Sequence, residues 1–276
     1  MVRSGLNLLI TVALAVSATG CEIQAQSFGV DGSFDRTLRA DGPIDLDVLS
    51  RSGHIHVKVG PAGSVRVIGQ IRAYGSLTFL HHYSATEQAR MLETTPPIDQ
   101  SGNTIRIGYI SDDALASNVT ISYEVTVPAE TRLRASSRSG DQTIEAIQGP
   151  VTASSRSGRI RVGGVPGDLN IETRSGEVEL RDQRSNVHVV SRSGRVTLEG
   201  QPAKRWAVQT RSGDVYVTLP QDGGAEIDVD SQSGAVDSSQ PLEMRMTTSR
   251  NRTQGVVGRG GGRLEVSTRS GSVRIR

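Results

Sequence analysis

Six arginines recur at nearly constant intervals in the second half of the chain, and their side chains are well suited to binding acidic groups. Each lies in a Ser-Arg-Ser-Gly or Thr-Arg-Ser-Gly segment: Arg138, Arg156, Arg174, Arg192, Arg211 and Arg269. A guanidinium group binds a carboxylate or a phosphate through paired hydrogen bonds. A regular row of them predicts an edge that binds an anionic glycan or a phosphorylated glycolipid. Nucleic acid is not expected, because the net charge of the whole chain is only +2.

A second interpretation of the same arginines is structural. Each guanidinium could bond the carbonyl groups of its own turn or a neighbouring carboxylate. We favour this interpretation from the sequence, because runs of surface charge are usually solvated and contribute little.

Other residues capable of chemistry are sparse. His54 and His56 would share one strand face about 7 Å apart, and with His81 and His82 they could bind zinc or copper. Two histidines without a third ligand are usually incidental, so no metal or other cofactor is expected. Acidic residues are scattered, and the pair Asp112-Asp113 falls in a predicted loop. A glycan hydrolase needs clustered carboxylates, so the chain is not expected to be an enzyme.

The element that carries the arginines is a repeat measured from glycine to glycine. Its glycines are Gly53, Gly140, Gly158, Gly176, Gly194, Gly213, Gly234 and Gly271. Apolar residues lie seven and five positions before each glycine, and in most copies two and four positions after it. Alternation by twos on both sides predicts two strands per coil. The fold class is therefore an all-β, parallel β-solenoid with about 18 to 20 residues per coil.

Polar columns accompany the apolar ones. The serine just before each glycine is predicted to point into the core beside the turn. The residue just after the glycine alternates in sign from Asp141 to Arg159, Glu177, Arg195 and Asp214. We expect these charges to pair between neighbouring coils and to fix their register.

The N-terminus has the layout of an export signal. Arg3 precedes an apolar run that ends near Ala18, and Cys21 is the only cysteine in the chain. The segment before Cys21 resembles a bacterial lipobox, which predicts a signal peptide over residues 1–20 and lipidation of Cys21. Glu22 follows the cysteine, and by the same resemblance an outer-membrane address is favoured in a cell with two membranes. A plain signal peptide cleaved near Ala18 or Ala25 is the alternative.

Three further segments follow the signal peptide. Residues 21–40 are a predicted linker, residues 41–132 a β segment, and residues 133–276 the regular solenoid. Within the β segment, residues 84–93 are predicted to form a helix, with Ser84 and Glu87 as a capping box. Near the C-terminus, Asn251 could replace a missing corner glycine and give one more coil. The last strand, Val273 to Ile275, would then be an exposed edge through which the protein self-associates.

The order of these segments resembles the bacterial adhesin-like family DUF4097. The resemblance covers about residues 40–276 and rests on Tyr123-Glu124-Val125-Thr126-Val127-Pro128 followed by the Ser-x-Ser-Gly coils. It implies a β-solenoid displayed at the cell envelope and brings no catalytic residues.

The predicted function is a non-enzymatic, lipid-anchored envelope protein that presents an adhesion, binding or scaffolding surface. Its expected partners are the membrane, an anionic glycan or glycolipid, or an envelope protein. A component that senses envelope stress through an anionic ligand is the alternative, and a glycan-active enzyme is a third and weaker hypothesis.

Overall fold

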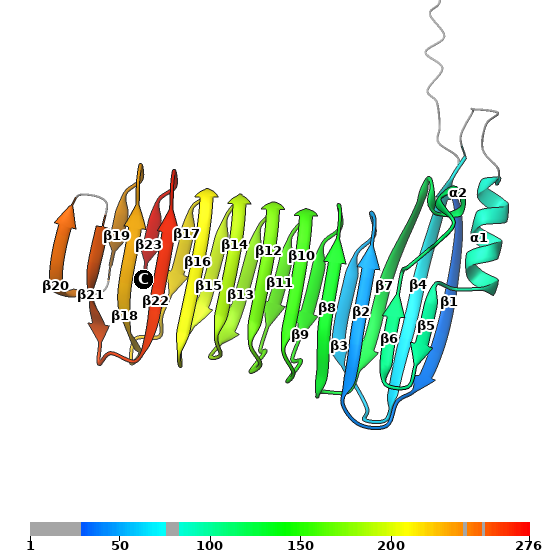
Figure 1. Ribbon diagram of the computed structural model, residues 1–276, viewed down its shortest axis with the longest axis horizontal. Helices are drawn as coiled ribbons and strands as arrows, with labels where there is room; N and C mark the ends of the chain where they lie inside the picture. The colour runs from blue at the N-terminus through cyan, green and yellow to red at the C-terminus, as the bar shows by residue number, and fades with distance from the viewer. Residues whose placement is uncertain (1–28, 76–82, 240–241, 250–251) are drawn as a thin grey trace, which may run out of the picture.

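Two long β-sheets lie face to face and enclose one continuous apolar core. The computed structural model describes residues 29–75, 83–239, 242–249 and 252–276. One sheet has 11 strands and the other has 12, and most neighbouring strands in them are parallel. Figure 1 shows the coils stacked in a straight row along the long axis of the molecule. The predicted parallel β-solenoid is confirmed.

Each regular coil has one strand in each sheet, joined by a glycine corner. The strands before the corner lie in the 12-stranded sheet: β2 (Ile44–Ser50), β8 (Thr131–Ser137), β10 (Val151–Ser157), β12 (Leu169–Ser175), β14 (Val187–Ser193), β16 (Arg205–Ser212), β18 (Gly224–Ser231) and β22 (Gly262–Thr268). The strands after it lie in the 11-stranded sheet: β3 (Ile55–Val59), β9 (Gln142–Glu145), β11 (Ile160–Gly163), β13 (Val178–Gln183), β15 (Val196–Gly200), β17 (Val215–Thr218), β19 (Val236–Ser238) and β23 (Val273–Ile275).

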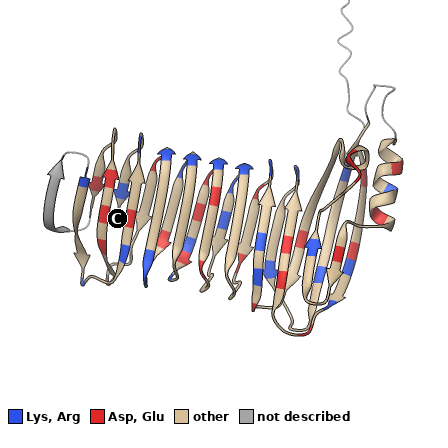
Figure 2. Ribbon diagram, viewed as in Figure 1, with Lys and Arg blue, Asp and Glu red and all other residues tan. Residues whose placement is uncertain are grey.

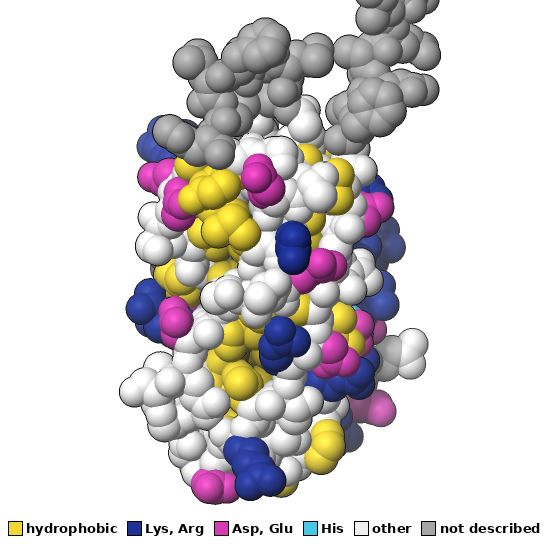
Figure 3. All heavy atoms as spheres, turned by 90° about the vertical axis from the view of Figure 1, so that its right-hand side faces the viewer, with side chains coloured by type: hydrophobic (Ala, Val, Ile, Leu, Met, Phe, Trp, Pro, Cys, Tyr) yellow, Lys and Arg dark blue, Asp and Glu magenta, His cyan; other side chains and the backbone are white. Residues whose placement is uncertain are grey.

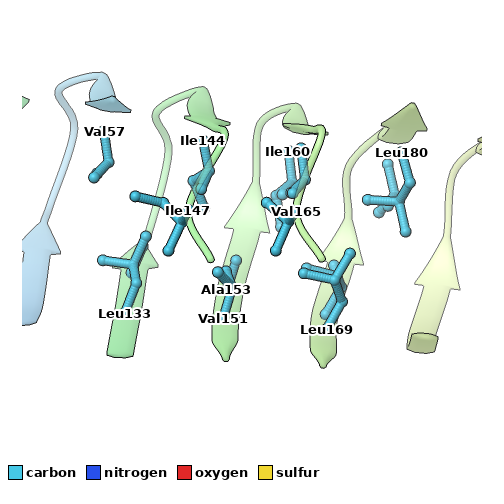
Figure 4. Packing of buried hydrophobic residues seen from close by; sticks show 14 of the residues in the cluster. Val57, Leu133, Ile144, Ile147, Val151, Ala153, Ile160, Val165, Leu169 and Leu180 are labelled. Carbon is cyan, nitrogen blue, oxygen red and sulfur yellow. The ribbon is translucent and has the colours of Figure 1, made fainter. Parts of the chain in front are cut away.

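The core consists of columns of aliphatic side chains that run along the stack. Leu133, Val151 and Leu169 occupy equivalent places on successive strands and are almost fully buried. Figure 4 shows this repetition, and it also shows Ile147 and Val165 reaching the core from the opposite turn. The alternation measured from the glycine predicts the strand positions but not this additional column.

The corner glycines are required by crowding between coils. A Cβ atom on Gly176 would lie 2.1 Å from the carbonyl oxygen of Gly158, and one on Gly194 would lie 2.0 Å from that of Gly176. Among the corner glycines, only Gly158 and Gly194 have a positive φ. The close backbone approach therefore excludes a side chain at this column even where φ is ordinary.

The predicted inward column of serines was assigned to the wrong position. Ser157 and Ser175, just before their glycines, are exposed because the chain already turns there. The buried hydroxyl column lies two residues earlier: Ser50, Ser137, Ser155, Thr173, Ser191, Thr210, Ser231 and Thr268. The strand alternation continues to this position and ends beyond it.

Two members of the buried column should respond oppositely to loss of the hydroxyl. The Ser137 hydroxyl lies 3.0 Å from the Gly140 carbonyl oxygen and accepts a hydrogen bond from Gln142 Nε2. The Thr173 hydroxyl has no hydrogen-bond partner among the described residues. We expect Ser137→Ala to cost about 1 to 3 kcal/mol and Thr173→Val to stabilise by about 1 kcal/mol, because only the second removes an unsatisfied group. Chemical denaturation of both variants checks this, and destabilisation by Thr173→Val would contradict it.

Antiparallel strands close the N-terminal end. The order β1 (Gly29–Arg39), β4 (Ser64–Tyr74), β7 (Val119–Val127) continues into β3, and β5 (Ile98–Ser101) and β6 (Thr104–Ile107) extend the other sheet. The predicted helix is confirmed as α1 (Ala85–Thr94), with the Ser84 and Glu87 capping box formed. It packs on β1 and β4. A second short helix, α2 (Asp113–Ala116), begins after its cap Asp112 and was not predicted.

The last coils are not stacked in sequence order. The coil of β22 and β23 lies between the coil of β16 and β17 and the coil of β18 and β19. Beyond β18, the strands β21 (Arg252–Gly258) and β20 (Leu242–Ser249) form an antiparallel hairpin. The additional parallel coil predicted there is wrong, and Asn251 itself lies outside the described residues. The exposed edge predicted at Val273 to Ile275 is also wrong, because β23 is bonded on both sides.

Amide hydrogen exchange should reveal this insertion. The Val273 amide donates to the Ala235 carbonyl, and the Arg276 amide donates to the Val217 carbonyl. We expect both amides to exchange as slowly as those of the central strands, since exchange requires opening of the stack. Fast exchange, typical of a frayed chain end, would contradict the observed order.

Candidate anion-binding groove

The six repeat arginines lie together on the outer face of the 12-stranded sheet. Each occupies the second position before its corner glycine, and each is exposed. Figure 2 shows basic residues at the arrowheads of β10, β12, β14 and β16, along the upper long edge of the molecule. We call this set of six the arginine row, and the long edge that carries the corner glycines the corner edge.

The order of the coils makes the arginine row continuous. In the sequence, Gln232 interrupts the series before Arg269. In the structure the Ser270 amide donates to the Arg211 carbonyl, so Arg269 lies directly beside Arg211. The Gln232 amide donates to the Thr268 carbonyl from the far side, which places Gln232 beyond the end of the row. Six arginines on adjacent strands span about 24 Å at the usual strand spacing.

The side chains of the arginine row have no ionic or hydrogen-bonded partner within the described parts of the chain. Several basic residues elsewhere are paired. Arg159 Nε lies 2.8 Å from Glu177 Oε2, and Arg72 Nε lies 2.7 Å from Asp31 Oδ1. Arg51, in the isolated first copy of the repeat, lies 3.0 Å from Asp113. Among the described residues, the arginine row therefore forms neither of the contacts that the structural interpretation requires, to a turn carbonyl or to a neighbouring carboxylate.

A groove of about 890 Å³ runs beside the arginine row. Five of the six arginines line it, from Arg156 to Arg269. Its other wall is the outward column two residues before the arginines: Ser154, Glu172, Val190, Gln209 and Ser267. Among the described residues no aromatic side chain lines the groove. It is a polar, cationic trough that suits an anion better than an apolar ligand.

Of the described residues that line this groove, Glu172 is the one with an acidic side chain, and no hydrogen bond or ion pair to another of them holds its carboxylate. Its charge opposes that of any anionic ligand beside Arg174. We expect Glu172→Gln to tighten binding of a soluble polyanion about fivefold, as removing one unfavourable charge near an ionic surface would do. Titration calorimetry at low salt checks this, and unchanged or weaker binding would show that the ligand does not occupy the groove.

Three of the five charges just after the corner glycines pair with each other, as predicted, and the other two accept hydrogen bonds from backbone amides. Glu177 lies between Arg159 at 2.8 Å and Arg195 at 3.7 Å. The pKa of the Arg159 guanidinium is raised by its hydrogen bond to Glu177 and by that charge. Asp141 accepts a hydrogen bond from the Arg159 amide, and Asp214 accepts one from the Ser272 amide. These carboxylates are therefore committed to the neighbouring coil and do not neutralise the arginine row.

The other candidate residues do not assemble into a site. His56 Nε2 lies 3.6 Å from Glu145 Oε2, and the described residues contain no group of three or more histidine, cysteine or acidic side chains that could hold a metal ion. Asp112 caps α2 and accepts a hydrogen bond from Tyr83. Cys21, His81 and His82 lie outside the described residues. No helix in the described ranges is long and apolar enough to cross a membrane.

The sequence predicts the arginines of this site but not the second wall of the groove. Its residues could have been found from the strand alternation, because a residue two positions before an outward arginine also points outward. The C-terminal end of the groove could not have been found in this way, because it depends on the order in which the last coils stack.

Solved structures with a similar chain path come from three bacterial proteins. A candidate cell adhesion protein from Clostridium sporogenes is 12% identical, with a TM-score of 0.40 over 89% of this chain and 99% of that chain. A candidate adhesin from Bacteroides fragilis is 11% identical, with a TM-score of 0.40 over 88% and 97%. A candidate lipid-binding protein from Parabacteroides distasonis is 10% identical, with a TM-score of 0.32 over 89% and 97%.

No curated protein matches the chain. The family profile described as Toastrack DUF4097 matches residues 98–276, which is more than half of the chain and includes the whole arginine row. The solenoid and its repeated Ser-Gly corners agree with this match. The chain belongs to the Toastrack DUF4097 family.

Proposed function

We propose that this protein is a non-enzymatic, lipid-anchored protein of the bacterial cell envelope that binds an anionic ligand along the arginine row. The observation that carries the proposal is six exposed guanidinium groups in one continuous row, with no partner among the residues that the structure describes. Like charges on adjacent strands repel, so the row costs stability in the free protein. An anionic ligand would remove that repulsion and gain bidentate hydrogen bonds.

A binding role is favoured over catalysis by the composition of the groove. Hydrolysis of a glycosidic bond ordinarily requires two carboxyl groups on either side of the bond. Among the described residues, Glu172 supplies the one carboxylate that lines the groove. The pair His56 and Glu145 lies in the other sheet, on β3 and β9. The ligand is therefore held by the arginine row and is released unchanged.

Attachment through Cys21 is the second part of the proposal. The apolar run before Cys21 and the absence of any other cysteine support it. Acyl chains on Cys21 would hold the protein on the outer membrane of a cell with two membranes. Incorporation of labelled palmitate into the wild type but not into Cys21→Ala is the expected result. Labelling of both proteins, or of neither, would rule out this anchor.

Binding itself is tested with the full chain in neutral detergent micelles and soluble polyanions. We expect an anionic polysaccharide and polyphosphate to bind at low salt, with affinity that falls steeply as salt rises. A neutral polysaccharide of the same length should not bind. Binding that ignores salt, or that prefers the neutral polymer, would remove the basis for an anionic ligand.

A further inference from the structure

The first described residue lies on the same edge of the solenoid as the arginine row. Gly29 pairs with Tyr74, and the Tyr74 amide donates to the Asn118 carbonyl, just before β7 begins. In β7, Ile121 lies against the corner glycine Gly53, where an added Cβ would be 1.9 Å from the Ile121 oxygen. Strand β1 therefore starts on the corner edge and runs away from it, as Figure 1 shows.

The segment between Cys21 and β1 is short. Seven residues lie between Cys21 and Gly29, and a fully extended chain over those eight residue steps reaches at most about 28 Å. A membrane that holds the acyl chains of Cys21 must then lie within that distance of the start of β1. The arginine row, about 24 Å long, begins on the same edge of the molecule.

Positive charge is concentrated on the corner edge. Over the six arginine coils, the positions two before and one after the glycine hold eight basic and three acidic residues, a net charge of +5. Because the whole chain carries +2, the rest of it carries −3. At the N-terminal end of the molecule, by contrast, acidic and basic side chains are interspersed (Figure 3). The excess positive charge therefore lies along one straight edge, and the rest of the chain has a net negative charge.

The side chains around the arginines let the guanidinium groups reach outward. The residue that follows each arginine is a serine, and those of the described coils are largely exposed, as at Ser157, Ser175 and Ser212. The next residue is the corner glycine. No bulky side chain at the tip therefore holds a flat anionic surface away from the arginine row.

These observations lead us to propose that the arginine row docks on the anionic headgroups of the membrane that carries the Cys21 anchor. The solenoid axis then lies parallel to the bilayer. This inference rests on the proposed function, since it requires both the anchor and the anionic preference of the row. A basic segment beside a lipid anchor strengthens attachment to anionic lipid, and stable anchoring generally takes two such signals.

A membrane surface fits the groove better than a free glycan chain. The groove lacks an aromatic platform among the described residues, and the arginines sit on an edge that the tether already holds near the bilayer. A soluble anionic glycan would bind with no preference for lipid and would leave the edge free to point away from the membrane. The orientation of the solenoid relative to the membrane therefore distinguishes a membrane ligand from a soluble glycan.

The test uses the full lipidated chain in vesicles with one fluorescent label. Because Cys21 is the only cysteine and is consumed by the acyl chains, Ser175→Cys gives a single labelling site on the corner edge. Gln148→Cys, exposed in the opposite turn between β9 and β10, is the matched control. Quenching by a nitroxide lipid is measured in vesicles of phosphatidylglycerol with phosphatidylcholine and in vesicles of phosphatidylcholine alone.

We expect strong quenching of the Ser175 label only in the anionic vesicles, and none of the Gln148 label. High salt, or glutamine at Arg156, Arg174, Arg192 and Arg211, should abolish the quenching while the protein stays in the vesicle fraction. Equal quenching of the two labels would overturn the inference. If the edge stays unquenched but the chain still binds soluble polyanions through these arginines, the membrane inference fails and the proposed function stands. If no anion binds in any form, both fail.

Discussion

Changing Arg156, Arg174, Arg192 and Arg211 to glutamine should weaken binding of anionic ligands on the order of several hundred-fold without lowering the melting temperature. Each basic residue close to an anionic surface contributes about 1 kcal/mol, so four of them account for that factor. None of these side chains makes a hydrogen bond or ion pair with another described residue. Removing their mutual repulsion should leave the melting temperature equal or slightly higher.

A matched control separates this effect from net charge. Arg39, Arg90, Arg184 and Arg259 are exposed arginines outside the row, and their change to glutamine removes the same charge. We expect that variant to lose only the small, nonspecific part of the affinity. Equal losses in the two variants would mean that overall charge, rather than the row, attracts the ligand. A clear drop in melting temperature for the row variant would indicate that its arginines stabilise the fold.

Replacing Gly176 by alanine should destabilise the solenoid by about 4 kcal/mol or more, an unusually large effect for one methyl group. The added Cβ would lie 2.1 Å from the carbonyl oxygen of Gly158. That oxygen belongs to the backbone of the neighbouring coil, which is held by hydrogen bonds on both faces and cannot move aside. The stack must therefore open at this coil, with loss of the packed core between Ile171 and Val178 and their neighbours.

Gly163→Ala is the control for this substitution. Gly163 lies at the end of β11 in the adjacent coil, and a Cβ there would meet no atom within 4 Å. We expect a change of less than about 0.5 kcal/mol in either direction. Denaturant unfolding of both variants gives the comparison. A loss below about 1 kcal/mol for Gly176→Ala would show that the coils are less tightly stacked than the structure indicates.

Much of the fold can be predicted from the sequence, because each coil repeats its own local pattern. The apolar positions on both sides of the glycine identify the two strands, and the buried columns of Leu133 and Ile160 follow from them. The capping box of α1 is equally local, since Ser84 and Glu87 bond each other. The serine column was misplaced because alternation cannot show at which residue a strand begins to turn.

The order of the last coils could not be predicted, because the repeat makes neighbouring coils interchangeable. Both Gly234 and Gly271 carry the pattern that would stack on Gly213. The hairpin of β20 and β21 pairs with β18 and so leaves the other side of β18 for β22. The sequence pattern of a single coil does not indicate which other strands it will pair with.

The candidate site could be predicted only in part, because contacts between coils are not encoded in the pattern of a single coil. The arginines were identified from their spacing, yet whether they were paired depended on side chains of other coils. The charges at Arg159 and Glu177 do pair between coils, as expected from their alternation. The arginine row has like charges at every step and so has no such partner. Its gap at Gln232 vanishes only when the three-dimensional order is known.

The salt dependence of polyanion binding tests the central claim most directly. The affinity of the full chain for polyphosphate should be measured at several salt concentrations, beside the row variant and the control variant. We predict a steep decline of log affinity with log salt for the wild type and the control, because bound phosphates release counterions. The row variant should have a slope smaller by about three to four, since about one counterion is released per contact. Identical slopes for all three proteins would contradict the assignment of the arginine row as the ligand-binding surface.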